Sequence, residues 1–355
     1  MKNRKSGLRI AFFIDLKCFG PERRSMKRKG ITNFLTLGMA VILLAAMMLA
    51  GCATESPSAN EGADTSVTET TQPQESETED GIVITDMVGR EVKLDAPATS
   101  VVALAAADVE SIFAIGAGDY LVGRGEYCNY PEEALEIQAV QSGNETNVEQ
   151  IISLEPQLLI LSVMAQDENQ IKQFEDAGIA VFINDPQDIE GTYQSISLLG
   201  KLLGKETEAE AVIGDMKKTF DDLQQKAAAA GGDPKTIYFE VSPLEFGLWT
   251  AGADTFMNEV AVLLNLDNIF SDVSGWAEIS EEQVLDRNPD YILTVGMYFG
   301  DGPTPIESIL SRSGWQNITA IKNEAILNLT ADELSRPGPR LALGATLLYE
   351  FVYES

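Results

Sequence analysis

The chain has 355 residues, with 55 acidic and 25 basic side chains, three cysteines, no histidine and a formal net charge of −30. Without histidine there is no Ser-His-Asp or Cys-His catalysis, no His-ligated zinc and no imidazole proton shuttle. The acidity also excludes the basic face that a nucleic-acid binder needs. With 45% apolar residues the chain can still bury a sizeable core, in one or two domains.

The first 51 residues predict an export signal. They hold ten basic and only two acidic residues, and an apolar run over residues 31–50 follows Met26-Lys27-Arg28-Lys29. Because such a signal needs nothing upstream, we expect Met26 to be the initiator. The run ends in Leu49-Ala50-Gly51-Cys52, which resembles a bacterial lipobox. The resemblance implies that Cys52 becomes a lipidated N-terminus on the outer face of the cytoplasmic membrane; the alternative is an uncleaved signal anchor.

After Cys52, residues 53–80 have the composition of a disordered spacer. They contain eight acidic residues, no aromatic residue and no Lys or Arg. Such a segment cannot bury enough apolar surface to offset its ordering entropy. The mutual repulsion of its acids keeps it extended, so we expect residues 52–80 to hold the folded part off the membrane.

From residue 81 onward, strand-like runs alternate with helical ones, which favours an α/β fold with mostly parallel sheets. A hairpin is predicted first, with strands over 82–86 and 91–94. The expected elements that follow are strands over 101–104, 157–161, 179–183, 236–241 and 291–295, and helices over 108–115, 167–177, 188–203, 255–264, 281–286 and 337–353. The helical pattern continues from 188 to 230 and is broken only around Gly204.

A repeat is visible when the chain is aligned with itself at an offset of 133 residues. Residues 147–160 match residues 280–293 without a gap, with Glu149 on Glu282, Gln150 on Gln283 and Pro156 on Pro289. Each copy predicts a short helix stopped by a proline and followed by a buried strand. The period is too long for a solenoid and indicates two similar lobes.

These features together resemble the substrate-binding lipoproteins of ABC importers in the cobalamin, ferric-siderophore and haem branch of the periplasmic-binding-protein superfamily. The matching segments are residues 86–92, 101–104 with Glu110 and 116–119, 127–131, both repeat copies, and Arg336-Pro-Gly-Pro-Arg340. The resemblance implies two Rossmann-like lobes (class III) over 81–204 and 231–355, joined by one helix within 205–230. It places the ligand in the cleft between the lobes.

The repeat's glutamates allow two interpretations. Glu149 and Glu282 lie in the first turn of short helices, where the macrodipole favours an acid. The resemblance implies in addition that each glutamate meets arginines of one subunit of an ABC permease dimer, which works with a cytoplasmic ATPase. Exposed pairs of this kind would steer association and set register more than add affinity.

Candidate ligand residues follow the predicted strands, because ligands of open α/β sheets bind beyond the carboxyl ends of the strands. Large aromatic side chains there suit a corrin, porphyrin or catecholate. The candidates are Tyr127, Trp249, Trp276, Arg124, Met164, Met297 and Tyr298. Other interpretations stay open: strand-end packing for the two methionines and a surface charge partner for Arg124.

The remaining residues narrow the ligand chemistry. Cys128 has no partner once Cys52 is lipidated, and it is either a packing residue or a thiolate ligand. Without histidine, a haem could take only Tyr, Met or Cys as axial ligand. Gly143 and Ser162 stand about where cobalamin binders carry tryptophans, which weakens the case for cobalamin. We interpret Arg336 and Arg340 as mainly structural.

We therefore expect a monomeric, non-enzymatic binding lipoprotein with no metal site and no cofactor of its own, whose ligand is an iron or cobalt chelate. The alternatives are a surface-anchored hydrolase, since paired carboxylates could cut glycosides, and an adhesion lipoprotein. No paired carboxylates fall in one candidate pocket, and the lobe repeat does not fit an adhesion role. An ATPase is excluded because Gly200-Lys-Leu-Leu-Gly204-Lys205-Glu206 is not a P-loop.

Overall fold

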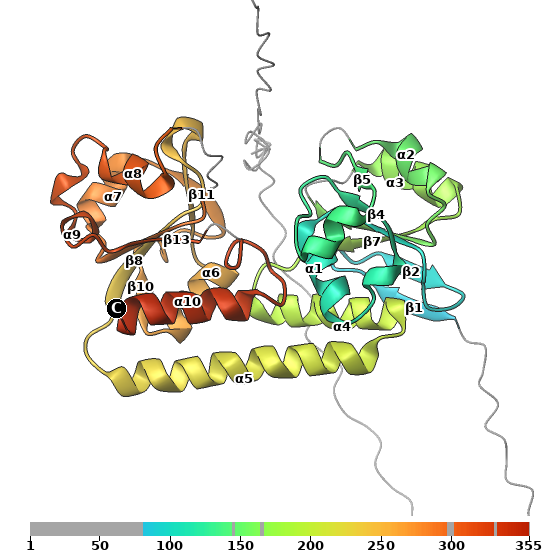
Figure 1. Cartoon of the computed structure of the whole chain (residues 1–355), viewed down its shortest axis with the longest axis horizontal. Coiled ribbons are helices and arrows are strands. Elements are labelled where there is room, and N and C mark those ends of the chain that lie inside the picture. Colours follow the sequence, from blue (N-terminus) through green and yellow to red (C-terminus); the bar gives the residue numbers. More distant parts are fainter. Residues whose placement is uncertain (1–80, 144–145, 164–166, 297–301, 330–331, 355) are drawn as a thin grey trace, which may run out of the picture. The chain divides into compact units, whose positions relative to one another are not determined.

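The computed structural model describes residues 81–143, 146–163, 167–296, 302–329 and 332–354. In these residues one group of strands and helices precedes the long helix α5 (Glu206–Ala230) and a second group follows it (Figure 1). Each group is built on a parallel sheet, as the sequence predicts. Among the helices described, none has the length and apolar character that crossing a membrane requires.

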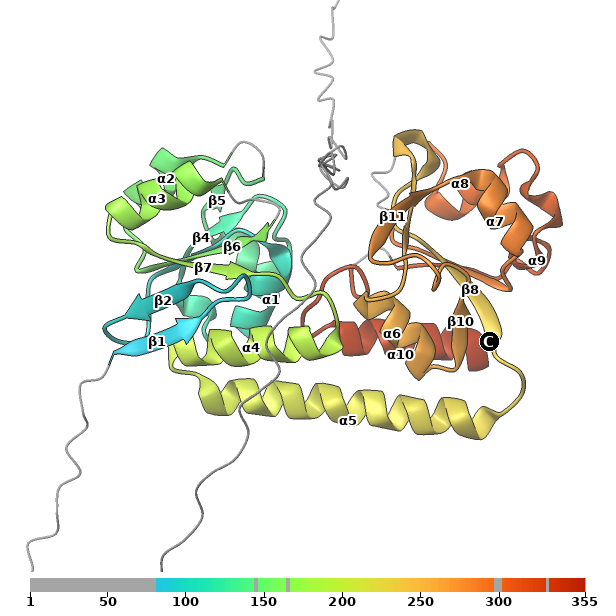
Figure 2. The same ribbon diagram turned by 180° about the vertical axis from the view of Figure 1, so that it is seen from behind.

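The folded region opens with the expected hairpin, in which β1 (Ile82–Thr85) and β2 (Glu91–Leu94) pair antiparallel. Its turn depends on Asp86, which is 4% exposed and whose carboxylate accepts hydrogen bonds from the amides of Val88 and Arg90 at 3.1 and 2.7 Å. The hairpin lies against the strand β7 (Ala180–Asn184) through a bond from Met87 N to Ile183 O of 3.2 Å (Figure 2).

The first lobe contains a five-stranded parallel sheet in the order β5-β4-β3-β6-β7. Its strands and its helices are β3 (Val101–Ala103), β4 (Leu121–Gly125), β5 (Ala139–Val140), β6 (Leu158–Ser162), β7, α1 (Ala106–Ala114), η2 (Gly118–Tyr120), η3 (Glu132–Glu136), α2 (Val148–Ser153), α3 (Glu168–Asp176) and α4 (Ile189–Leu203).

Helices cover both faces of this sheet, and the strand β6 shows the consequence. Its Leu158 and Ile160 join a core that includes residues of α1 and α4, whereas Leu159 and Leu161 join a second core with α2 and α3. Because neither face meets water, the strand is apolar at successive positions and does not alternate. That is why a continuous apolar run correctly predicts a buried strand here.

The predicted helix break at Gly204 is confirmed. Gly204 ends α4 in the left-handed conformation with φ +63, where a side chain would be strained, and its amide bonds back to Gly200 O. The next helix, α5, buries Met216, Phe220, Leu223 and Ala227, spaced so that they share one face. These residues belong to one core with residues of both lobes.

The second lobe contains a four-stranded parallel sheet in the order β10-β8-β12-β13, beside an antiparallel pair of β9 and β11. Its elements are β8 (Lys235–Glu240), η5 (Leu244–Phe246), β9 (Leu248–Ala251), α6 (Phe256–Leu263), β10 (Leu266–Asn268), β11 (Trp276–Ile279), α7 (Glu281–Arg287), β12 (Tyr291–Thr294), α8 (Pro305–Leu310), η6 (Trp315–Asn317), α9 (Thr319–Lys322), β13 (Ile326–Asn328) and α10 (Leu341–Tyr353).

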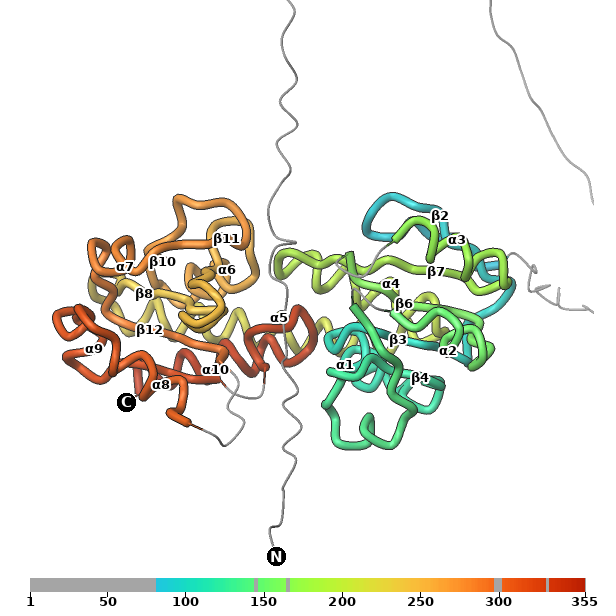
Figure 3. Tube along the Cα trace, turned by 90° about the horizontal axis from the view of Figure 1, so that it is seen from above, coloured from blue at the N-terminus to red at the C-terminus, as the bar shows by residue number. Residues whose placement is uncertain are grey.

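The two lobes contact each other besides sharing α5. That helix packs against α4 of the first lobe and against α6 and α10 of the second (Figure 3). At the start of α4, Ile189 N donates to a carboxylate oxygen of Glu259 in α6 at 2.7 Å, and Phe256 N donates to Gln187 O at 3.0 Å. The amino end of one lobe's helix is therefore capped by a side chain of the other lobe.

The repeat found in the sequence corresponds to a repeat in the fold. In each copy a capped short helix leads into a central strand: α2 into β6, which lies next to β3, and α7 into β12, which lies next to β8. Asn147 and Ser280 cap these helices by accepting from the amides of Gln150 and Gln283 at 3.0 and 3.4 Å. The helix, proline and strand order predicted for both copies is confirmed.

The predicted start of one helix is wrong, and several strands, β4 among them, were not predicted. The last helix was expected over 337–353 but begins at Leu341, because residues 336–340 form turns in which Gly338 N bonds to Arg336 O and Leu341 N to Gly338 O. The strand β4 was missed because Gly123 and Gly125 remove its apolar pattern. A Cβ on Gly125 would come within 2.1 Å of Leu104 O, so only glycine fits this strand against its neighbour.

Candidate functional site

The carboxyl end of β4 in the first lobe leads into residues 126–131, which we call the Tyr127 loop. Tyr127 and Tyr130 are 52% and 45% exposed, whereas Cys128 between them is 1% exposed. The Cys128 thiol points inward and donates to Leu104 O at 3.6 Å. Burial, then the nearby Asp108 charge, raises the pKa of Cys128 to about 12, so the thiol keeps its proton. Cys128 is a packing residue that anchors the loop.

Arg124, at the end of β4, does not present a charge to the surface of the lobe. It is 7% exposed, and its guanidinium donates to the carbonyl oxygens of Ala134, Gly125 and Glu126 at 2.7, 3.0 and 3.4 Å. The expectations of a cation open to a ligand, or of a surface ion pair, are corrected. Arg124 stabilises the chain around the Tyr127 loop from inside the lobe. Its guanidinium donates hydrogen bonds to backbone carbonyl oxygens of this irregular part of the chain.

A buried ion cluster joins the two lobes, and we call it the Glu110 clasp. Glu110 of α1, 3% exposed, accepts from Nε and Nη2 of Arg340 at 2.9 and 2.7 Å and from Nη1 of Arg336 at 2.8 Å. Arg336 also binds Asp332 at 2.5 Å. A single carboxylate of the first lobe thus satisfies two arginines of the second.

The same two arginines hold the Tyr127 loop. Arg336 Nη1 donates to Asn129 Oδ1 at 2.9 Å, and the Arg340 guanidinium lies 4.0 Å from the centre of the Tyr130 ring. The structural role expected for Arg336 and Arg340 agrees with these contacts. Their position shows in addition that the second lobe fixes the loop that carries Tyr127.

In the second lobe the carboxyl end of β8 carries an internal ion pair. Arg312 donates to both carboxylate oxygens of Glu240 at 2.6 and 2.8 Å, and the two side chains are 4% and 2% exposed. The Arg312 guanidinium also lies 4.5 Å from the centre of the Trp315 ring. Sequence reasoning missed this pair, because its members are 72 residues apart.

The loop after β8 exposes apolar side chains that were not among the predicted site residues. Leu244 and Phe246 of η5 are 41% and 50% exposed. Trp249, expected in a loop, instead lies in β9 and is 9% exposed. Trp276 is half-buried in β11, with its ring centre 5.4 Å from that of Phe256. The sequence contains a signal for the exposed pair of Leu244 and Phe246: the turn-like segment Pro243-Leu-Glu-Phe-Gly247 comes directly after a predicted strand.

Glu149 and Glu282 are both exposed and both lie in the first turn of corresponding helices, α2 and α7. The backbone amide of Glu282 and the Ser280 hydroxyl lower the pKa of Glu282, so this glutamate is ionised at neutral pH. The structure therefore gives the two lobes equivalent exposed acids, as the repeat predicts.

Four predicted site residues lie outside the residues that the structure describes: Cys52, Met164, Met297 and Tyr298. Within the described residues, no group of three or more Cys, Asp or Glu side chains is arranged to hold a metal ion.

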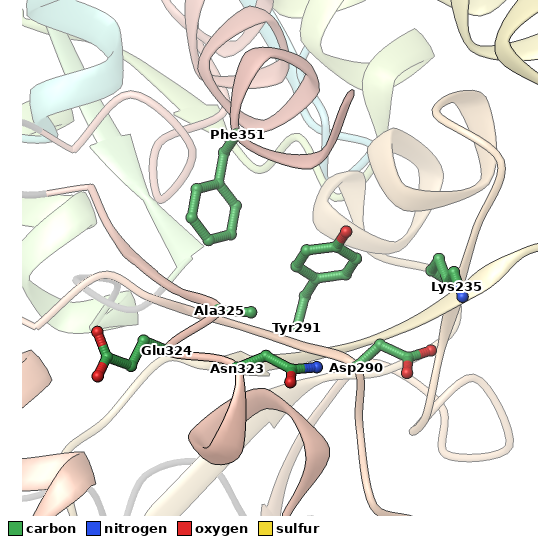
Figure 4. A pocket seen from close by; sticks show the side chains of 7 residues that line it. All are labelled: Lys235, Asp290, Tyr291, Asn323, Glu324, Ala325 and Phe351. Carbon is green, nitrogen blue, oxygen red and sulfur yellow. The ribbon is translucent and has the colours of Figure 1, made fainter. Parts of the chain in front are cut away.

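A cavity of about 390 Å³ lies at the opposite edge of the second sheet (Figure 4). Lys235, Tyr291 and Ala325, which line it, stand at the amino ends of β8, β12 and β13. The rings of Tyr291 and Phe351 meet edge to face there, 5.8 Å apart. The cavity is thus separate from the candidate ligand residues, which follow the carboxyl ends of the strands.

Beneath the Tyr127 loop, α1 buries Asp108, which is 2% exposed. It accepts a hydrogen bond from the amide nitrogen of Asn184, which also donates to Ser195 at 2.7 Å, and its second carboxylate oxygen has no hydrogen-bond partner. Burial raises the pKa of Asp108 to about 7, against the lowering effect of the Asn184 bond.

Comparison with known proteins decides the family. Residues 101–333 match the family described as Periplasmic binding protein. The chain belongs to this family. It is 33% identical over 318 residues to an ABC transporter substrate-binding lipoprotein of Bacillus subtilis (strain 168), a match that covers 88% of this chain and 96% of the relative.

Two further relatives extend this comparison. A vitamin B12-binding protein of Photorhabdus laumondii is 28% identical over 70% of this chain and 86% of its own length. A solved structure of a possible iron-binding periplasmic protein from Staphylococcus epidermidis superposes with a TM-score of 0.60, at 28% identity over 72% of this chain and 99% of that chain. The predicted family, the two-lobed class III fold and the role as a substrate-binding protein of an ABC transporter are confirmed. The periplasmic binding protein functions outside the cytoplasm.

The Glu110 clasp predicts a large loss of stability when its shared acceptor is removed. In Glu110→Gln, Arg340 loses the carboxylate that it binds and Arg336 keeps only Asp332 as a carboxylate partner, so we expect the free energy of unfolding to fall by about 3 kcal/mol. Urea denaturation followed by circular dichroism measures this.

The exposed pair of Lys172 and Asp176, with nitrogen and oxygen 2.8 Å apart, provides the control for the clasp experiment. Asp176→Asn should leave the free energy of unfolding almost unchanged, since exposed ion pairs contribute little to stability. Equal effects of the two substitutions would contradict the role of the clasp.

Asp108 predicts a pH dependence of stability. Its pKa in the folded protein, about 7, is above the ordinary value of 3.8, so the folded state holds a proton that the unfolded chain releases. The contribution of Asp108 to the free energy of unfolding is therefore largest at low pH, and it decreases as the pH rises from about 4 to 7. Asp108→Asn, which stays neutral, should unfold at higher urea concentration than the unaltered protein at pH 8, with a smaller difference at pH 5.

The exposed Asp95 gives the matched control, because Asp95→Asn should leave the difference between pH 5 and pH 8 unchanged. If Asp108→Asn were no more stable than the unaltered protein at pH 8, the pKa of Asp108 would not be raised in the folded protein.

Proposed function

We propose that this periplasmic binding protein captures an iron or cobalt chelate between its lobes and delivers it to an ABC permease dimer. The observation that carries the delivery step is the duplicated unit in which Glu149 and Glu282 stand exposed on corresponding helices. Similar lobes that each present one acid fit a permease made of two similar subunits. A capping preference alone accounts for an acid in a first turn but not for its repetition.

The capture step is supported by the exposed aromatic and apolar side chains on the two lobes. Tyr127 in the first lobe and Phe246 with Leu244 in the second are 41–52% exposed in loops that follow carboxyl ends of strands. Exposed aromatic groups at such an edge suit the flat or bulky organic shell of a metal chelate. One relative is named for binding vitamin B12, which is a cobalt chelate, and the other is described as a possible iron-binding protein.

The lipobox-like segment ending in Cys52 and the acidic spacer support membrane attachment. We propose that a lipid on Cys52 anchors the chain to the outer face of the cytoplasmic membrane, with residues 53–80 as the tether. The nearby permease would then meet a binding protein confined to the same surface, which raises the local concentration of one partner for the other.

Direct titration tests capture. Purified full-length protein in mild detergent is mixed with cyanocobalamin, ferrichrome and haemin, and binding is followed by calorimetry and by absorbance. We expect one of these chelates to bind with micromolar or tighter affinity, and Tyr127→Ala to weaken it about tenfold through lost stacking.

Val262, which is 66% exposed on α6, supplies the control for the titration. Val262→Ala should bind as the unaltered protein does. Failure of every chelate to bind, together with turnover of a substrate, would favour the hydrolase alternative.

Uptake by whole cells tests delivery. The double variant Glu149→Lys with Glu282→Lys should bind the chelate normally and yet lose most transport, because two attractive charges become repulsive. Glu168→Lys, in the exposed first turn of the neighbouring α3, is the control and should transport normally. Full uptake by the double variant would contradict the docking role.

A further inference from the structure

The positive charges of the folded region are few and can all be located. Residues 81–355 contain fifteen basic and 45 acidic side chains and no histidine. The gaps between the described residues contain no lysine or arginine, so the structure describes all fifteen cations. A ligand that depends on a fixed cation in this protein must therefore use one of these fifteen.

The four arginines near the candidate ligand residues are engaged inside the protein. Arg124 donates to three carbonyl oxygens under the Tyr127 loop, and Arg312 binds Glu240 through both of its terminal nitrogens. Arg336 and Arg340 share Glu110. All four side chains are buried or nearly so, and releasing any of them to a ligand would leave a buried carboxylate or carbonyl group unsatisfied.

The other eleven cations stand outside the Tyr127 loop and the loop after β8, and Arg90, in the hairpin turn near the end of β7, is paired with Asp86 and Glu175. They stand on the opening hairpin, on α3, α4, α5, α7 and α9, after α4, and at the amino end of β8: Arg90, Lys93, Lys172, Lys201, Lys205, Lys217, Lys218, Lys226, Lys235, Arg287 and Lys322. Lys235, for example, lines the cavity at the opposite edge of the second sheet.

Carboxylates accompany the exposed aromatic groups instead. Glu126 directly precedes Tyr127 and is exposed, and Glu245 is exposed between Leu244 and Phe246. Glu278, also exposed, lies beside the same loop, 3.4 Å from the position that a Cβ on Gly247 would take. The ligand-facing loops of both lobes thus combine apolar contact area with negative charge.

We propose that the chelate this protein accepts is neutral or cationic and carries an apolar or amide-bearing shell. This inference rests on the proposed capture of a chelate. A ligand with free carboxylates or ionised catecholates would meet the field of the acidic lobes and the adjacent glutamates. None of the four arginines near these loops could pair with it without breaking an internal bond. A neutral amide or hydroxamate shell avoids that repulsion and can use the aromatic groups for contact.

Chelates that differ in charge test the inference with full-length protein, and the members of the first pair also share the same body. One pair is cyanocobalamin and its monocarboxylate, in which one peripheral amide is hydrolysed. A series comprises cationic ferrioxamine B, neutral ferrichrome and trianionic ferric enterobactin, with haemin as the porphyrin that carries two propionates. Within whichever group binds, we expect the anionic chelate to bind at least about tenfold more weakly.

The salt dependence of binding and one variant test whether charge repulsion causes the weaker binding of the anionic chelate. Between about 0.05 and 0.5 M salt, any residual affinity for the anionic chelate should rise, because screening weakens repulsion. Glu126→Lys should strengthen binding of the anionic chelate several-fold, far more than it changes binding of the neutral one. Glu210→Lys, an exposed change on α5, is the matched control and should alter neither affinity.

The outcomes separate the two proposals. An anionic chelate that binds more tightly than its neutral counterpart, with affinity that falls as salt is added, overturns the charge inference and leaves capture intact. Failure of all the chelates, whatever their charge, overturns the proposed function and the charge inference together.

Discussion

The carboxylate of Glu110 links the contact between the two lobes to the Tyr127 loop. It is almost fully buried in the first lobe, yet both of its hydrogen-bonding arginines, Arg336 and Arg340, belong to the second. The same arginines contact Asn129 and the ring of Tyr130. The position of the Tyr127 loop is therefore set by both lobes, because a buried carboxylate that lost its arginines would be strongly destabilising.

The helix α5 and the core around it also hold the two lobes together. Met216, Phe220 and Leu223 of α5 pack in one core that contains residues of both lobes, and Glu259 caps α4 from across the lobe contact. The apolar face of α5, the cross-lobe cap and the Glu110 clasp are three separate constraints on how the lobes meet. These contacts oppose a large movement of one lobe relative to the other.

The arginines also show how tertiary contacts change the chemistry that a sequence suggests. Arg124 looks in the sequence like a cation available to a carboxylate, but the fold directs its donors to three backbone carbonyl groups. Trp249 looks like a loop aromatic and is instead a strand residue that is 9% exposed. Phe246, in η5, is the exposed aromatic side chain of the segment before β9.

The sequence by itself determined the repeating pattern of strands and helices, the break at Gly204 and the correspondence of Glu149 with Glu282. These features depend on local rules: apolar periodicity, a glycine in the left-handed conformation and helix caps near in sequence. Only the tertiary structure decided which side chains are exposed and which charges neutralise one another. Glu110 and Arg340 are 230 residues apart and Glu240 and Arg312 are 72 apart. No local pattern records such pairs, because they form only when the lobes and sheets have packed.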